Sequence, residues 1–487
     1  MTKTALLLVA LAACGDNIRP TTPPPVTRSI TGFAHLVTHD LKGTPTVFPI
    51  DLYDTLVTAQ VPTADGWDVR EGPTTHAGTF EIDDVPPGFV WLEVDDVVSG
   101  ARQLLWTDAS QLAFEENAVG RGDASVAHPG TTLTLGPIDG LTPVAADDSF
   151  QLTSGDLGFA ANLFPGLADG ATTFQTTRSW GGQPLISAMA GDDLTIAQVR
   201  ASTVNGLDII SPVKAAHLTV EQQDAANTSV TGHFETPPAL TYELVWLRSL
   251  SVDAAAETHP TRVGPVAAVD AALRAMPGSP RYGTSPLAPP VLSFASGFPV
   301  DGTDLDLTFP LTNPYPPAWL FNDFTMTFPV SVVPPDGIDE GLQLPVTFEV
   351  DTNQLASPDH PIEPLVTPPR APQLDGRDLF TDLAGTGTTP TLSWSPPRAG
   401  RSDAYVITVH QWFVLYQNTT LTPIATLIVP GDVTSVKLPA RLLETGEHYV
   451  LQIIAVAQPG LDVRRHSLYT VGVPLGFAPL VTNTFSP

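Results

Sequence analysis

The sequence predicts an all-β protein made of several β-sandwich domains in tandem. Proline contributes 50 of the 487 residues, about twice its usual share of 5%, and so much proline disfavours long helices. Short apolar stretches with alternating polar residues recur between Gly, Pro and Asp, which is the pattern of strands joined by turns. The length fits about three or four domains of 100 to 200 residues each.

Residues 1–13 have the features of an export signal. Lys3 precedes an apolar run that is too short to cross a bilayer but is typical of a secretory signal peptide. The run ends in Leu11-Ala12-Ala13-Cys14, which resembles the lipobox of bacterial lipoproteins. The resemblance implies that Cys14 is lipidated and becomes the mature N-terminus, anchored to a membrane. The alternative is an ordinary secretory signal with a chance cysteine.

The residue after Cys14 bears on which membrane holds the anchor. In the lipoprotein family an aspartate directly after the cysteine retains a protein at the inner membrane. Here Gly15 follows and Asp16 comes one position later. We therefore expect the bacterial outer membrane, with the protein facing the periplasm or the cell surface.

Composition restricts the partners of the chain. The formal net charge is −29 with only 22 basic residues, which argues against nucleic acid and anionic lipid surfaces because both require clusters of Lys and Arg. Cys14 is the only cysteine, so we expect apolar burial without disulfides to hold the domains together. We expect a monomeric ectodomain without a cofactor, with an envelope protein or polysaccharide as its partner.

Shifts in composition set the predicted segment boundaries. Prolines 20 and 23–25 favour an extended tether. Residues 141–368 could form one large sandwich or two smaller ones, and we expect two, divided near Pro237-Pro238. The predicted segments are a tether at 14–28 and β-rich domains at 29–140, 141–238, 239–368 and 369–487.

The first domain contains an informative motif at residues 78–88. Phe80 and Ile82 alternate to one face before Pro-Pro-Gly turns the chain into the next strand. The motif resembles the Gly-x-Phe-x-Ile-x-x-Val-Pro-x-Gly hallmark of the transthyretin-like, or carboxypeptidase regulatory-like, module, over residues 28–98 and at most to 140. The resemblance implies a stalk or spacer without catalytic residues. Residues 99–128 do not fit it, and we expect an insertion or a long loop there.

The middle region resembles no family. Val266, Val269, Leu273 and Met276 recur near helical spacing, so we predict a helix at residues 265–276. Alternating apolar residues predict strands at 194–199, 217–220, 242–247, 305–311 and 324–333.

The last domain has the motifs of a known sandwich. Leu392 and Trp394 lie on one face of a predicted strand, and Tyr405 opens the next one. The order Leu443, Gly446, Tyr449 then leads into an apolar strand at 449–456. This series resembles a fibronectin type III domain over residues 372–487, in which Tyr449 would bond back to the upstream backbone. The resemblance implies a binding or spacer module at the far end of the molecule.

Two groups of residues are candidate sites. Tyr315, Trp319, Phe321 and Phe324 could form an aromatic platform for a sugar or a peptide, although such rings more often pack in a core. Asp301, Asp304 and Asp306 could present carboxylates to Ca²⁺, although Asp-Gly is also ordinary turn chemistry.

The sequence contains no Gly-x-Ser-x-Gly, His-Glu-x-x-His or phosphate-binding Gly-rich motif, and the Ser-x-x-Lys at residues 211–214 lacks its partner motifs. Arg121-Gly122-Asp123 spells a cell-attachment tripeptide, but three residues recur by chance. We expect a lipid-anchored cell-envelope protein with a non-catalytic binding, adhesion or scaffolding role. The alternatives are an envelope enzyme with its active site in residues 141–368 and a calcium-stiffened stalk.

Overall fold

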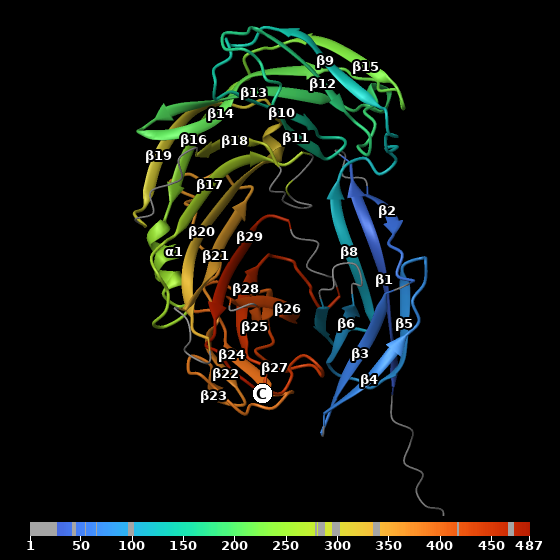
Figure 1. Cartoon of the computed structure of the whole chain (residues 1–487), viewed down its shortest axis with the longest axis vertical. Coiled ribbons are helices and arrows are strands. Elements are labelled where there is room, and N and C mark those ends of the chain that lie inside the picture. The colour runs from blue at the N-terminus through green and yellow to red at the C-terminus, as the bar shows by residue number, and fades with distance from the viewer. Residues whose placement is uncertain are drawn as a thin grey trace, which may run out of the picture.

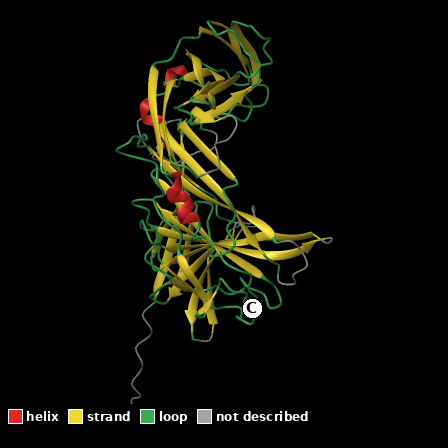
Figure 2. Ribbon diagram, turned by 90° about the vertical axis from the view of Figure 1, so that its left-hand side faces the viewer, coloured by secondary structure: helices red, strands yellow, loops and turns green. Residues whose placement is uncertain are grey.

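The computed structural model is made almost entirely of strands (Figure 2), which confirms the predicted all-β class. The strands form four β-sandwiches, numbered 1 to 4 in chain order. The signal peptide, Cys14, most of the predicted tether and Asp301 lie outside the described residues. The structure describes residues 27–40, 45–53, 55–64, 66–95, 102–277, 280, 288–294, 302–334, 341–415, 418–465 and 472–487.

Sandwich 1 is built around the long strand β1. Strands β2 and β5 pair antiparallel with β1, and β8 runs parallel to it. Phe80 and Ile82 of β5 are buried, as their alternation predicts. Its strands are β1 (Arg28–His39), β2 (Pro45–Pro49), β3 (Leu56–Thr63), β4 (Gly66–Gly72), β5 (Thr79–Val85), β6 (Val90–Asp95), β7 (Arg102–Thr107) and β8 (Gln111–Val119).

Strands β7 and β8 correct the prediction of a loop or an insertion at residues 99–128. β7 pairs with β6, and β8 extends along nine residues of β1. Leu104 and Leu105 of β7 are both buried because each face of this strand contacts a different core. Such a strand has no polar alternation, which is the signal that predicted the other strands.

Sandwich 2 places the sheet β12-β9-β15 over strands β10, β11, β13 and β14. Its core includes Leu133 and Leu135 of β9 and ends at Phe234. The core therefore begins before residue 141, where the second domain was expected to start. The strands are β9 (Thr132–Asp139), β10 (Ser149–Ser154), β11 (Phe159–Leu163), β12 (Thr173–Ser179), β13 (Leu194–Val204), β14 (Leu207–Leu218) and β15 (Asn227–His233).

Sandwich 3 pairs β16 with β19 on one side and β18, β17, β20 and β21 on the other. The helix α1 (Arg248–Ala255) follows β16. The short 3-10 turn η3 (Pro317–Trp319) precedes β20. The strands are β16 (Ala239–Trp246), β17 (Ala268–Ala275), β18 (Pro290–Phe294), β19 (Leu305–Thr312), β20 (Leu320–Val332) and β21 (Leu342–Thr352).

The helix predicted at residues 265–276 is wrong, because these residues contain β17. Val269, Ala271, Leu273 and Ala275 are buried at every second position, and β17 pairs with β20 along its full length. The spacing of Val269 and Leu273 fits a helix and a strand equally well. The two alanines, which carry little hydrophobic signal, complete the strand pattern.

Sandwich 4 has two sheets, β23-β22-β24-β27 and β26-β25-β28-β29. The strand predicted to begin at Tyr449 is present as β28. The described strands are β22 (Arg370–Leu374), β23 (Arg377–Asp378), β24 (Thr391–Ser395), β25 (Ala404–Leu415), β26 (Asn418–Pro430), β27 (Ser435–Lys437), β28 (Tyr449–Ala457) and β29 (Leu475–Val481).

The four sandwiches are joined edge to edge through one sheet. Its 16 described strands run in the order β11-β10-β13-β14 of sandwich 2, β18-β17-β20-β21 of sandwich 3, β29-β28-β25-β26 of sandwich 4 and β7-β6-β3-β4 of sandwich 1. The sheet curves so that sandwich 4 returns to sandwich 1 (Figure 1). Sandwich 4 was expected at the far end of the molecule. It lies instead beside sandwich 1.

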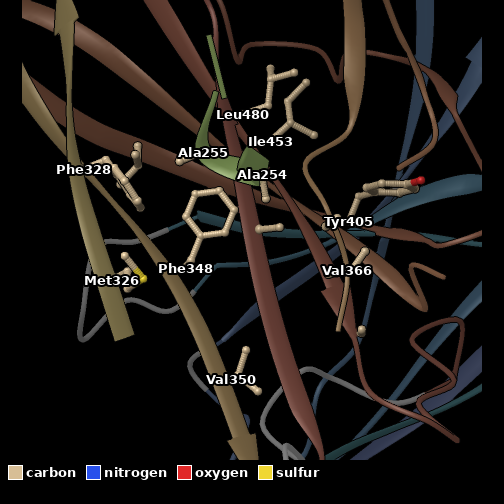
Figure 3. Packing of buried hydrophobic residues seen from close by; sticks show 14 of the residues in the cluster. Ala254, Ala255, Met326, Phe328, Phe348, Val350, Val366, Tyr405, Ile453 and Leu480 are labelled. Carbon is tan, nitrogen blue, oxygen red and sulfur yellow. The ribbon is translucent and has the colours of Figure 1, made fainter. Parts of the chain in front are cut away.

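Sandwiches 3 and 4 share one hydrophobic core. Phe348 of β21 lies in the same cluster as Tyr405 of β25 and Leu480 of β29 (Figure 3). Ala254 and Ala255 of α1 cover this cluster with small side chains. Trp91 and Trp106 of sandwich 1 also belong to it, so one core crosses three of the sandwiches.

Candidate binding surface

The expected aromatic platform is not present at the surface. Tyr315, Trp319, Phe321 and Phe324 are exposed by only 4%, 5%, 1% and 2%, so the four rings are core residues. The Tyr315 hydroxyl donates a 3.2 Å hydrogen bond to Oε1 of Gln151 on β10. This corrects the platform prediction, because buried rings cannot stack on a ligand, and that of Tyr315 fastens sandwich 3 to sandwich 2.

The expected calcium residues are separated by their surroundings. Oδ1 of Asp304 accepts a 2.9 Å hydrogen bond from the amide of Ser249, in the first turn of α1. Asp306 lies exposed on β19, opposite Val245 of β16. In the described part of the chain no three His, Cys, Asp or Glu side chains gather as metal ligands, and Asp301 lies outside that part. The structure gives Asp304 a role at the start of α1.

Arg121 joins sandwich 1 to sandwich 2. Its Nε and Nη2 lie 3.0 and 2.9 Å from the two carboxylate oxygens of Asp192, whose side chain is fully buried. Its Nη1 contacts the exposed carboxylate of Asp123 at 2.6 Å. Burial and the nearby carboxylates of Asp193 and Asp192 raise the pKa of Asp156 to about 6. The arginine of the Arg-Gly-Asp tripeptide is thus held within a joint and is not presented to a receptor.

The most distinctive exposed surface is the outer side of the sheet β12-β9-β15. Two rows of three side chains cross it, with β9 in the middle of each row. Every member carries a hydroxyl or a carboxamide, and none is charged or aromatic. We call this surface the distal face and define it by Ser179, Thr132 and Asn227 in one row and Thr177, Thr134 and Ser229 in the other.

Strand alternation explains why these side chains gather. Leu133 and Leu135 point into the core of sandwich 2, which turns Thr132 and Thr134 outward. The four members on the edge strands are exposed, and the two on β9 are half-buried. Neighbouring members lie about 4.8 Å apart across the strands and about 6.8 Å apart along them.

Hydrogen bonds hold the distal face in a fixed arrangement. The hydroxyls of Thr132 and Thr134 donate to Oδ1 of Asn227 at 2.8 and 2.9 Å. The Thr134 and Thr177 hydroxyls are 3.0 Å apart, and Nδ2 of Asn227 donates to the Ser229 hydroxyl at 3.2 Å. Each hydroxyl keeps further capacity to donate or accept, so the face can bind a ligand rich in hydroxyl groups.

The distal face lies far from the start of β1. Residue 28 begins β1. At the other end of β1, the Gly120 amide donates to the carbonyl of His39, and Gly120 lies against the Leu157 backbone of sandwich 2. Figure 1 shows β9, β12 and β15 at the end of the long axis opposite the start of β1 and the C-terminus. Among the described residues, the helices are all too short or too polar to cross a membrane.

Comparison with known proteins leaves the chain without an assigned family. No protein-family model and no curated protein matches it. The pilus adhesin SpaC from Lactobacillus rhamnosus GG overlaps 72% of this chain and 41% of its own, at 10% identity and a TM-score of 0.11. A Streptococcal ancillary pilin overlaps 66% of this chain and 95% of its own, at 11% identity and a TM-score of 0.10. The chain spans about two fifths of SpaC, and TM-scores this low do not establish a common arrangement of domains.

Proposed function

We propose that this chain is a lipid-anchored protein of the bacterial outer membrane whose ectodomain binds envelope polysaccharide without catalysis. The distal face is the observation that carries the proposal. It displays an ordered array of uncharged hydroxyl and amide groups at the end of the molecule opposite the start of β1. Such groups exchange hydrogen bonds with a polyol without the cost of desolvating a charge.

The charge of the chain supports a glycan over a protein partner. The formal net charge is −29, so most of the surface repels acidic polymers. The six members of the distal face are uncharged, and they also lack the aromatic and arginine anchors that dominate protein interfaces. A neutral polysaccharide therefore fits this face better than a folded protein does.

The family resemblances of sandwiches 1 and 4 fit a non-catalytic role. We propose that sandwich 4 is a fibronectin type III-like module. Its support is the pair of sheets described above and the 2.8 Å hydrogen bond from the Glu444 amide to the Tyr449 hydroxyl. We propose that sandwich 1 is a transthyretin-like module, supported by the buried Phe80 and Ile82 and the turn into β6.

The binding role is tested with the ectodomain, residues 27–487, against insoluble envelope polysaccharide. We expect Thr177→Lys to reduce retention at least tenfold, because the long charged side chain disrupts the array. Thr347→Lys is the matched control, since Thr347 is exposed and its hydroxyl lies 3.0 Å from that of Thr327, away from the distal face. Equal retention of both variants would refute the distal face as the binding surface.

The anchor is tested in the full chain with a radiolabelled fatty acid. We expect Cys14→Ser to abolish labelling and to release the protein from the membrane fraction. Gly15→Asp should keep the label and move the protein to the inner membrane. Labelling of Cys14→Ser would contradict the proposed anchor and leave the polysaccharide test unaffected.

A further inference from the structure

Sandwich 1 has a partly open cavity of about 460 Å³ between its two sheets. Phe80 and Phe114 line it from the sheet of β1, and Val57, Leu92 and Leu105 line it from the facing sheet. The volume lies within the range of about 300 to 1,000 Å³ that small-molecule sites occupy. Close-packed interiors leave few such spaces, so the two sheets of sandwich 1 are not packed fully against each other here.

Small residues and a sheet junction create the space. Ala34 of β1 contributes only a methyl group where the facing wall carries leucines. Ile428 of β26 extends the wall across the junction with β7, so sandwich 4 also lines the cavity. The lining is mostly apolar, which favours an apolar occupant.

The polar groups at the rim of the cavity indicate which head group a ligand with an apolar tail would carry. Asp51 and Glu116 are exposed members of the wall, and Gln103 adds an amide. The His76 ring nitrogen lies 2.8 Å from the Asp51 carboxylate. Among the described lining residues there is no Lys or Arg, so the rim attracts a cation and repels a carboxylate or sulfate.

We propose that this cavity binds a single-chain amphiphile, with its aliphatic chain between the sheets of sandwich 1 and an uncharged or cationic head at Asp51 and Glu116. The site is separate from the distal face and does not depend on polysaccharide binding. Because Ile428 lines the cavity, an occupant contacts sandwiches 1 and 4 together and stabilises their junction.

Calorimetry on the ectodomain tests the proposal with three probes below their micelle concentrations: dodecyltrimethylammonium, dodecyl maltoside and dodecyl sulfate. We expect saturable binding of one molecule of the first two, at least tenfold tighter than any binding of dodecyl sulfate. Ala34→Leu should weaken the binding at least tenfold by filling the cavity. Ala239→Leu, at an exposed position of β16, is the matched control and should bind normally.

A second variant keeps the test valid if Ala34→Leu fails to fold. Glu116→Lys changes an exposed rim residue and should reverse the preference toward dodecyl sulfate. The absence of saturable binding, or binding that neither variant changes, would overturn the site. Equal affinity for dodecyl sulfate and dodecyltrimethylammonium in the unmodified chain would overturn the assignment of the head group.

Discussion

The indole Nε1 of Trp91 donates a 2.8 Å hydrogen bond to the carbonyl oxygen of Lys437. Trp91 lies on β6 in sandwich 1, and Lys437 ends β27 in sandwich 4. Beside this bond, β7 and β26 pair in parallel over four residues, and the Ala440 amide donates to Oε1 of Gln60 at 2.8 Å. The first and last sandwiches are therefore packed against each other. This contact closes the loop that the chain makes through sandwiches 2 and 3.

Trp91→Phe tests this closure. The variant keeps an aromatic ring in the core but leaves the carbonyl of the half-buried Lys437 without its donor, so we expect the free energy of unfolding to fall by about 1–3 kcal/mol. Urea unfolding of the ectodomain, followed by circular dichroism, measures the change. The transition should be assigned by hydrogen exchange, because a multidomain chain need not unfold in one step.

Trp67→Phe provides the matched control on β4, which is separated from β6 by β3 in the same sheet. The Nε1 of Trp67 is buried and finds no hydrogen-bond partner among the described residues. Its loss removes an unsatisfied donor, so we expect a change below about 1 kcal/mol. Similar losses in the two variants would mean that the Trp91 hydrogen bond does not hold the closure.

Arg121 provides a second test, at the joint of sandwiches 1 and 2. Arg121→Gln leaves the carboxylate of Asp192 buried without its ion pair, beside Asp156 and Asp193. Breaking such a buried pair costs about 3–5 kcal/mol, and urea unfolding of sandwich 2 measures it.

Asp123→Asn removes the other ion pair of the same arginine. The Asp123 side chain is 76% exposed, and exposed pairs contribute about 0–1 kcal/mol. We therefore expect Asp123→Asn to leave the stability of sandwich 2 nearly unchanged. Equal effects of the two variants would show that the buried Arg121–Asp192 pair contributes no more to stability than the exposed Arg121–Asp123 pair.

Glu349 makes stability depend on pH where sandwiches 3 and 4 meet. It lies on β21 opposite Phe477 of β29. Burial raises its pKa to about 7, and the nearby carboxylate of Asp323 adds to the effect. The folded protein therefore holds a proton that the unfolded chain releases at lower pH. The resulting stability is complete below about pH 4.5 and is lost as the pH rises through 7.

Glu349→Gln should flatten this part of the pH profile. We expect the urea midpoint of the unmodified ectodomain to fall between pH 5 and pH 8, and the fall to be smaller in the variant. Glu243→Gln, at an exposed position of β16, should keep the full pH dependence. A profile that Glu349→Gln does not change would assign the dependence to other groups.

Sequence patterns predicted the strands better than their assembly. Phe80 and Ile82 of β5, like Leu392 and Trp394 of β24, alternate with polar residues and are buried as expected. The parallel pairing of β7 with β26 left no such pattern, because backbone hydrogen bonds between sheet edges do not require particular side chains. The edge pairing with sandwich 1 therefore corrects the expected position of sandwich 4 at the far end of the molecule, while the tandem sandwiches themselves are confirmed.

The distal face was only partly predictable. Thr132 and Thr134 alternate with Leu133 and Leu135, which indicates one polar face on a strand. The complete array also requires β12 and β15, from distant parts of the chain, in register beside β9. The aromatic residues around Tyr315 suggested a surface platform but are buried. The density of rings in a sequence does not distinguish a core from a platform.

Tyr449 is a residue whose contact could be anticipated from the sequence. It is fully buried, and its hydroxyl accepts a 2.8 Å hydrogen bond from the Glu444 amide. Tyr449→Phe keeps the ring but leaves that amide unpaired, so we expect a loss of about 1–3 kcal/mol of unfolding free energy. Hydrogen exchange at the Glu444 amide should accelerate in the variant. Tyr53→Phe, at a 60% exposed position, should change neither quantity, and unchanged exchange in Tyr449→Phe would show that this corner does not depend on the hydroxyl.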